Sequence, residues 1–60
     1  MNLIRIDIKE NYWEWILDGQ MVMKGRFISH ARDNLRLTVT TEQREMDFPL
    51  NQIIIEYIKG

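Results

Sequence analysis

A turn signal followed by two alternating stretches constrains the fold of this chain most. Asp18-Gly19 precedes residues 20–29 and 35–39, in which apolar and polar side chains alternate. Glycine tolerates the positive φ that a two-residue hairpin turn needs, and aspartate accepts it better than most residues. The sequence therefore predicts a hairpin between 12–17 and 20–29. Gly25 inside the second strand marks a bend or bulge, which is typical of a small barrel in which one strand serves two sheets.

Other segments alternate in the same way and predict further strands. Apolar residues occupy every second position in 3–9, 12–17, 35–41 and 44–48, the spacing of strands with one buried face. The residues that share these faces, with those of 20–29, are Ile4, Ile6, Ile8, Trp13, Trp15, Leu17, Met21, Met23, Phe27, Leu35, Leu37, Val39, Met46 and Phe48. We assign Trp13 and Trp15 to the core, because two indoles on one face of so short a chain are core residues more often than a binding surface.

Polar stretches separate the predicted strands. Residues 29–34 are polar enough for a connecting loop with Asp33-Asn34 as its turn, and a short helical turn is the alternative. Thr41-Glu42-Gln43 predicts a polar turn. Pro49 ends the strand before it, because proline lacks the amide donor that a ladder needs. Residues 50–52 then predict a single tight turn.

The last predicted strand, 53–58, is apolar on both faces. Its apolar residues are Ile53, Ile54, Ile55, Tyr57 and Ile58. A bare apolar edge recruits other chains. We therefore expect this strand to lie in the middle of a sheet or to form an oligomer edge that pairs with a neighbouring subunit.

The length of the chain bounds its stability. Residues 1–60 make a single domain, and a domain of this size buries only about 60% of its unfolded surface. The chain has no cysteine and one histidine, which excludes disulfides and argues against a structural zinc. The remaining sources of stability are an unusually apolar core and burial against another copy of the chain. The composition permits both, and we favour a homo-oligomer. Arg5 and Asp7 interrupt the apolar start, so we expect no signal peptide, no membrane span and a cytoplasmic protein.

These features predict an all-β domain: a small, strongly bent antiparallel barrel of five or six strands, without a long helix. Residues 15–58 resemble the Sm-like fold of Sm proteins and the bacterial RNA chaperone Hfq, within the SH3-like barrels. The resemblance rests on Asp18-Gly19, on Gly25 in a bent strand, on Asn34-Leu35-Arg36-Leu37 and on the closing pattern from Met46 to Ile58. It implies the fold and, for the family, RNA binding by ring-shaped oligomers.

The chain departs from the Sm-like pattern at the positions that contact RNA in that family. His30 and Ala31 stand where Sm proteins carry an acidic residue. Before the last strand, Phe48-Pro49 or Pro49-Leu50 stands where Sm proteins have an Arg-Gly or Lys-Gly pair and Hfq has a Lys-His pair. Residues 3–9 read as a strand, whereas a helix precedes the barrel in Sm proteins. The resemblance therefore implies the fold more strongly than it implies RNA binding.

Charge is distributed unevenly along the sequence. Five basic and two acidic residues give 24–44 a net charge of +3, while the whole chain has −1. A basic middle favours a patch for a protein partner or nucleic acid, and the alternative is an ordinary solvated surface of mixed sign. If 20–29 and 35–41 are adjacent strands, the patch comprises Lys24, Arg26, His30, Arg32 and Arg36.

No catalytic constellation is evident in the sequence. Ser29 and His30 are neighbours, which point to opposite faces of a strand, and no third group orients them. The carboxylates are scattered singly and no glycine-rich phosphate loop exists. We therefore expect no enzyme activity, no cofactor, no metal and no small-molecule substrate.

Three functions are consistent with these sequence features. The first is a non-catalytic binding module that acts through another protein, such as a compact regulator or inhibitor of the kind that phages and other mobile elements encode. The second is an Sm-like protein that binds RNA or single-stranded nucleic acid through the basic residues. The third is a homo-oligomeric subunit whose last strand completes the sheet of a neighbour.

Overall fold

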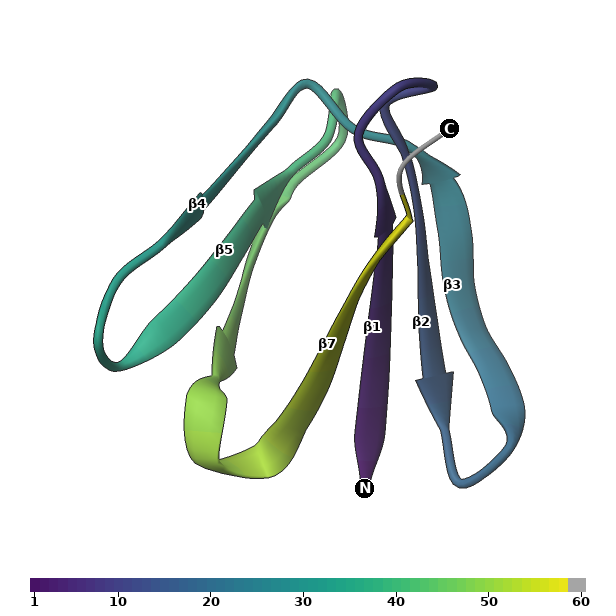
Figure 1. The fold of residues 1–60 in the computed structure, drawn as a ribbon. Coiled ribbons are helices and arrows are strands. Elements are labelled where there is room, and N and C mark those ends of the chain that lie inside the picture. Colours follow the sequence, from purple (N-terminus) through teal and green to yellow (C-terminus); the bar gives the residue numbers. More distant parts are fainter. Residues whose placement is uncertain (59–60) are drawn as a thin grey trace.

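Seven strands and one short 3-10 turn make up residues 1–58, the part of the chain that the computed structural model describes (Figure 1). Their bounds are β1 Asn2–Asp7, β2 Tyr12–Leu17, β3 Gln20–Arg26, β4 Ser29–Arg32, β5 Arg36–Thr40, β6 Glu45–Pro49, η1 Leu50–Gln52 and β7 Ile53–Ile58. The strands form sheet A, in the order β3-β2-β1-β7, and sheet B, in the order β4-β5-β6. The all-β prediction is confirmed, with seven strands where five or six were expected. The two sheets do not close into a barrel.

The core lies between the two sheets, which face each other in Figure 1. Its buried residues come from both, and they are Ile4, Ile6, Trp13, Phe27, Leu37, Val39, Phe48 and Ile53. Phe48 of sheet B sits against both indoles of sheet A, with ring centroids 5.8 Å from Trp13 and 4.9 Å from Trp15. Tilted and edge-on aromatic contacts of this kind add to the free energy of burial. The assignment of Trp13 to the core is confirmed, and the partly buried Trp15 packs against it.

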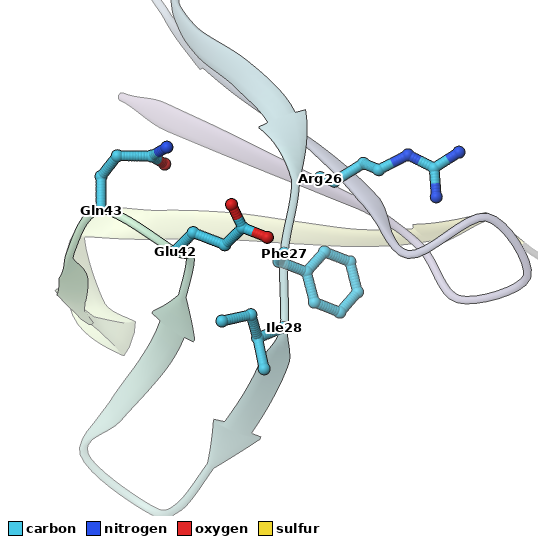
Figure 2. Close-up of a pocket in the computed structure, with 5 residues that line it drawn as sticks. All are labelled: Arg26, Phe27, Ile28, Glu42 and Gln43. Atoms are coloured by element: carbon cyan, nitrogen blue, oxygen red, sulfur yellow. The ribbon is translucent and has the colours of Figure 1, made fainter.

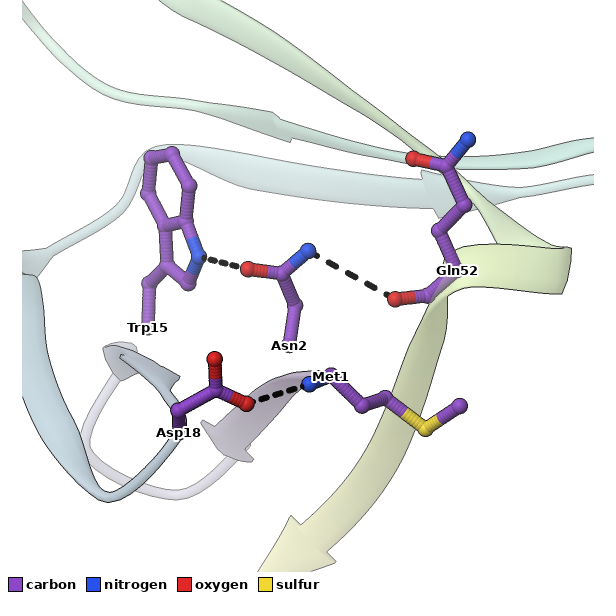
Figure 3. Close-up of polar contacts among 5 residues, drawn as sticks. All are labelled: Met1, Asn2, Trp15, Asp18 and Gln52. Carbon is purple, nitrogen blue, oxygen red and sulfur yellow. Dashed lines mark hydrogen bonds and ion pairs between the residues drawn. The ribbon is translucent and has the colours of Figure 1, made fainter.

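The hairpin predicted at Asp18-Gly19 is confirmed. Asp18 has φ 50° and Gly19 has φ 82°, so both central residues adopt the left-handed conformation of a type I′ turn. The N-terminal ammonium of Met1 lies 2.6 Å from Oδ1 of Asp18, which places the start of the chain beside this turn (Figure 3). The turn joins β2 to β3 in antiparallel pairing.

The bend predicted at Gly25 carries the chain from sheet A to sheet B. Gly25 has φ 150°, a value that other residues rarely adopt. Just after it, the amide of Phe27 donates to the carbonyl of Asn11 at 2.9 Å, and the amide of Ile28 donates to the carbonyl of Thr40 at 2.7 Å. One amide thus bonds beside sheet A and the next bonds to sheet B. Figure 1 shows this crossing between β3 and β4.

Residues 29–32 form a strand, so the prediction of a loop over 29–34 is wrong for its first four residues. β4 pairs antiparallel with β5, from Ser29 opposite Thr40 to Arg32 opposite Leu37. The free edge of β5 supplies ladder partners, and this tertiary pairing outweighs the weak strand preference of the segment. The turn expected at Asp33-Asn34 follows directly.

A bulge separates two methionines that the alternation places on one face. Met23 lies opposite Trp15 and Met21 lies opposite Ile16, which leaves Val22 without a partner. The extra residue turns Met21 to the outer side of sheet A, where it is 47% exposed, while Met23 packs against the core.

The last strand, β7, lies at an edge of sheet A. It pairs with β1 in parallel, so the expectation of a wholly antiparallel sheet is wrong. Of the two places expected for this strand, the central one is also wrong, and pairing of its edge with a neighbouring subunit stays a prediction. Ile53 is buried and Ile55 packs against the core, while Ile54 is 55% exposed on the other face. The tight turn predicted for 50–52 is confirmed as η1.

Besides Met21, three residues predicted to face inward are exposed instead. Ile8 lies beyond the end of β1, Leu17 is the last residue of β2, and Leu35 precedes β5. Leu35 is 68% exposed, whereas Leu37, two residues further along the chain, is completely buried. The alternation of apolar residues in the sequence therefore continues to and past the ends of the strands, where the opposite sheet does not cover it.

Candidate interaction surfaces

The outer face of sheet A points away from sheet B and carries its side chains in three rows. Residues directly opposite each other in neighbouring strands point to the same side of a sheet. In the first row Ile16 lies between Met21 and Leu3, and Leu3 also lies opposite Ile54. All four side chains are apolar, and the two at the ends of the row are about half exposed. An apolar row thus crosses the full width of the sheet.

The second row of this face alternates in charge. It runs Lys24, Glu14, Arg5 and Glu56 across the four strands. Nη1 of Arg5 lies 3.3 Å from Oε1 of Glu14, and Nε of Arg5 lies 3.1 Å from Oε1 of Glu56. Both pairs are partly solvated, so each contributes on the order of 0.5 kcal/mol to stability. Their clearer effect is to fix the position of the Arg5 guanidinium on the face.

The third row is mixed and completes the surface. It contains Arg26, Tyr12, Asp7 and Ile58 in the same strand order. The core residues of sheet A all lie on its inner face, so no element of residues 1–58 covers the three rows. We call these three rows, with their twelve residues, the outer face of sheet A.

The predicted basic patch is divided between the two sheets. β3 pairs with β2 and β5 pairs with β4 and β6, so the adjacency assumed for β3 and β5 is wrong. Lys24 and Arg26 lie near the end of β3, before the chain crosses to sheet B. Arg32 and Arg36 flank the turn at the far end of β4, about 20 Å of extended chain away from Arg26.

His30, the fifth residue of the predicted patch, is a half-buried residue of β4 in sheet B. Its ring lies edge-on to Phe27, with centroids 5.3 Å apart, and 6.3 Å from the ring of Tyr57. Ser29 beside it is exposed, as expected for neighbours in a strand. The histidine therefore packs against Phe27 of the crossing between the sheets and against Tyr57 of sheet A.

A basic cleft lies where β3 meets the turn between β5 and β6. Lys24 and Arg26 border it from one side and Arg44 from the other. The rest of its lining is Trp13, Met23, Gly25, Thr41 and Gln43. Arg44 was counted in the basic middle of the sequence but not in the predicted patch, because no sequence signal places the 41–44 turn beside β3.

Figure 2 shows the hollow next to this cleft, which shares Arg26 and Gln43 with it. Phe27, Ile28 and Glu42 complete its lining. The guanidinium of Arg26 extends away from the carboxylate of Glu42 (Figure 2). The acidic side chain therefore does not neutralise the basic border of the cleft by direct contact.

The carboxyl of Asp33 organises the turn between β4 and β5. Its Oδ1 accepts hydrogen bonds from the amides of Leu35 at 2.7 Å and Arg36 at 3.0 Å. These two bonds, and then the charge of Arg36, lower the pKa of Asp33 below its ordinary value. Asp33 thus holds Arg36 and the start of β5 in place through the backbone.

The residues that could carry chemistry lie apart. Within residues 1–58, no three His, Asp or Glu side chains gather closely enough to hold a metal ion. No helix in this described part is long and apolar enough to cross a membrane.

Comparisons with known protein families, with curated proteins and with solved structures find no match to this chain.

Proposed function

We propose that this protein is a non-catalytic binding module that acts by contact with another protein, and that the outer face of sheet A is the surface it uses. The observation that carries the proposal is the uncovered apolar row of Met21, Ile16, Leu3 and Ile54. Four strands spaced about 4.8 Å apart make this row roughly 15 Å long between the outer strands. Contiguous exposed apolar surface with a polar border is characteristic of interaction sites.

The composition of the face supports the same conclusion. Protein interfaces combine an apolar centre with a polar rim, and they are enriched in tyrosine, methionine and arginine. The outer face of sheet A carries Tyr12, Met21, Arg5 and Arg26 beside its aliphatic residues. A compact regulator or inhibitor that works in the cytoplasm is the role that such a surface fits.

A proposal about the fold class accompanies the proposed function. We place the chain among the SH3-like small β-barrels, with the Sm-like proteins as the subgroup that its sequence resembles. The bend at Gly25 between two sheets and the 3-10 turn before the last strand support this placement. Many modules of this class bind other macromolecules without catalysis, but the fold alone does not select the partner.

Position-specific cross-linking tests the proposed surface. A photo-reactive phenylalanine analogue is placed at position 16, on the outer face, or at position 35, where Leu35 is equally apolar but lies at the far end of sheet B. With the protein at about 1 mM in an extract of the cells that produce it, we expect a defined covalent adduct from position 16 and none from position 35. Adducts from position 35 alone, or from neither position, would contradict the proposal.

Nucleic-acid binding at the basic cleft is the second candidate. Lys24, Arg26 and Arg44 line the cleft together with Trp13, which is almost completely buried. The three cations suit a phosphate backbone, whereas the buried indole offers little surface for stacking a base. The cleft therefore supports this candidate less than the outer face supports the first.

Fluorescence anisotropy with a labelled single-stranded RNA separates the two candidates. If the cleft binds RNA, the Arg26→Glu/Arg44→Glu variant should weaken low-salt binding by about tenfold or more, and affinity should fall steeply as salt rises. The Arg32→Glu/Arg36→Glu variant is the matched control at the far end of sheet B. If the wild-type protein does not bind at low salt, the second candidate is wrong.

A further inference from the structure

We infer that the partner of the outer face of sheet A is a second copy of this chain, packed face to face about a two-fold axis that runs parallel to the strands. The inference deepens the proposed function and rests on it for the choice of surface. The observation that selects a second copy is the alternating charge of the middle row, which is complementary to itself under this one rotation.

The rotation reverses the order of the strands and keeps each row in place. A two-fold axis above the boundary of β1 and β2 sets β2 of one protomer over β1 of its partner, and β3 over β7. Arg5 then faces Glu14 of the partner subunit, and Lys24 faces Glu56 of the partner subunit. Every charge in the middle row meets the opposite sign, four times across the interface.

The other two rows are compatible with the same packing. The apolar row packs against the same row of the partner with the strand order reversed. Leu3 therefore lies over Ile16 of the partner subunit, and Met21 lies over Ile54 of the partner subunit. In the third row, Tyr12 lies over Asp7 of the partner subunit, which its hydroxyl can donate to. Aligned sheets cross at about 30°, so the contacts nearest the axis, those of Arg5 and Glu14, stay in closest register.

The alternative two-fold packing is disfavoured by the same residues. An axis in the plane of the face but perpendicular to the strands sets each strand over itself and reverses the rows. Lys24 would then meet Lys24 of the partner subunit, Arg5 would meet Arg5 of the partner subunit, and the apolar row would cover the mixed row. Like charges placed opposite one another make the free energy of association less favourable, which disfavours packing about the perpendicular axis.

The size of the face predicts a weak dimer. Twelve residues on each side are fewer than the roughly 20–30 of a standard interface. The Arg5 pairs already formed within one protomer also mean that charges set the register more than they add affinity. We therefore expect dimerisation at high micromolar concentrations and a monomer on dilution.

Charge-reversed variants, alone and mixed, test the geometry by light scattering between about 10 µM and about 1 mM. The wild-type mass should rise toward twice the monomer mass. Arg5→Glu places carboxylates over Glu14 of the partner subunit, and Glu14→Arg places cations over Arg5, so each variant alone should stay monomeric. An equal mixture of the two should dimerise again, because every cross-interface pair then has opposite signs. Mixing the two variants does not restore the ion pairs within either protomer. Recovered dimerisation therefore depends on the contacts across the interface alone.

A second pair of variants tests the same geometry if the first pair does not fold. Lys24→Glu and Glu56→Lys follow the same logic at the margins of the face, where Lys24 forms no ion pair within the described residues. If circular dichroism shows that Arg5→Glu or Glu14→Arg is unfolded, this pair decides the question. Mixtures that stay monomeric while the wild type dimerises overturn the proposed geometry.

A wild-type chain that remains monomeric up to about 1 mM overturns the dimer itself. The proposed function fails by a different result, the absence of any adduct from position 16. An adduct at that position with an unrelated protein, together with a monomeric wild type, would reject the second copy and keep the surface.

Discussion

Trp15 and Asn2 are joined by a hydrogen bond in which the indole Nε1–H donates to Oδ1 of Asn2 over 2.8 Å. The amide of Asn2 in turn donates to the carbonyl of Gln52 at 3.5 Å, so one side chain connects β2, β1 and η1 (Figure 3). Both bonds lie at the end of sheet A where the termini of three elements meet. The polar edge of Trp15 is satisfied there while its ring contacts Phe48.

Replacing Asn2 should therefore destabilise the fold. Asn2→Ala leaves the part-buried indole N–H without its acceptor, and we expect a loss of about 1 kcal/mol in the free energy of unfolding. Urea denaturation measures it. Asn51→Ala, an exposed asparagine in the neighbouring turn, is the control and should change stability by less than about 0.5 kcal/mol. Equal effects of the two variants would contradict this role for Asn2.

The two leucines of the Leu35–Leu37 pair should respond very differently to truncation. Leu37 is completely buried between the sheets, so Leu37→Ala should cost about 3 kcal/mol, which is a large share of the stability of a 60-residue domain. Leu35→Ala removes an exposed side chain and should stay within about 0.5 kcal/mol of wild type. Thermal or urea unfolding of both variants measures the difference. A large loss for Leu35→Ala would show that the turn residue is buried after all.

Gly25 tests whether the bend between the sheets depends on backbone freedom. A Cβ added at this position would meet nothing within 4 Å, so any cost of Gly25→Ala comes from the φ of 150°. We expect a loss of about 1–3 kcal/mol in the free energy of unfolding. Gly19→Ala, also in open space but at φ 82°, should cost about 1 kcal/mol. A neutral Gly25→Ala would mean that the bend has another cause.

Asp33 predicts how stability changes at acid pH. Its folded-state pKa lies below the ordinary value of 3.8 because two backbone amides, then Arg36, favour the carboxylate. Folding therefore binds fewer protons at this group, so its contribution is complete above about pH 3.8 and is lost as the pH falls through the folded-state pKa. Asp33→Asn keeps an acceptor oxygen but cannot titrate. Its unfolding free energy should fall less steeply below pH 3.8 than that of wild type, and an identical pH profile would contradict this assignment.

Local patterns predicted much of the fold. The hairpin at Asp18-Gly19, the bend at Gly25 and the turn at 50–52 depend on residues with strong backbone preferences, and all three are present. The alternation of 35–41 correctly placed Leu37 and Val39 in the core. It failed for Leu35, because periodicity does not show where the opposite sheet ends.

Long-range pairing could not be predicted from the same patterns. β1 and β7 lie at opposite ends of the chain, and only the folded structure places Arg5 beside Glu56. The bulge at Val22 likewise follows from the pairing of β2 and β3 and not from its own residue type. The outer face of sheet A is built from these pairings, so no local pattern in the sequence indicates it, whereas the uneven charge of the sequence indicates the basic residues of 24–36.

The most direct test follows the methyl signals of the protein by NMR as its concentration rises from about 10 µM to about 1 mM. The central claim tested here is that two copies of this chain meet through the outer face of sheet A. We predict concentration-dependent shifts at the methyl groups of Leu3, Ile16 and Ile54, with those of Ile28 and Leu35 unchanged. Shifts centred on Ile28 and Leu35, or no shifts at any concentration, would contradict it.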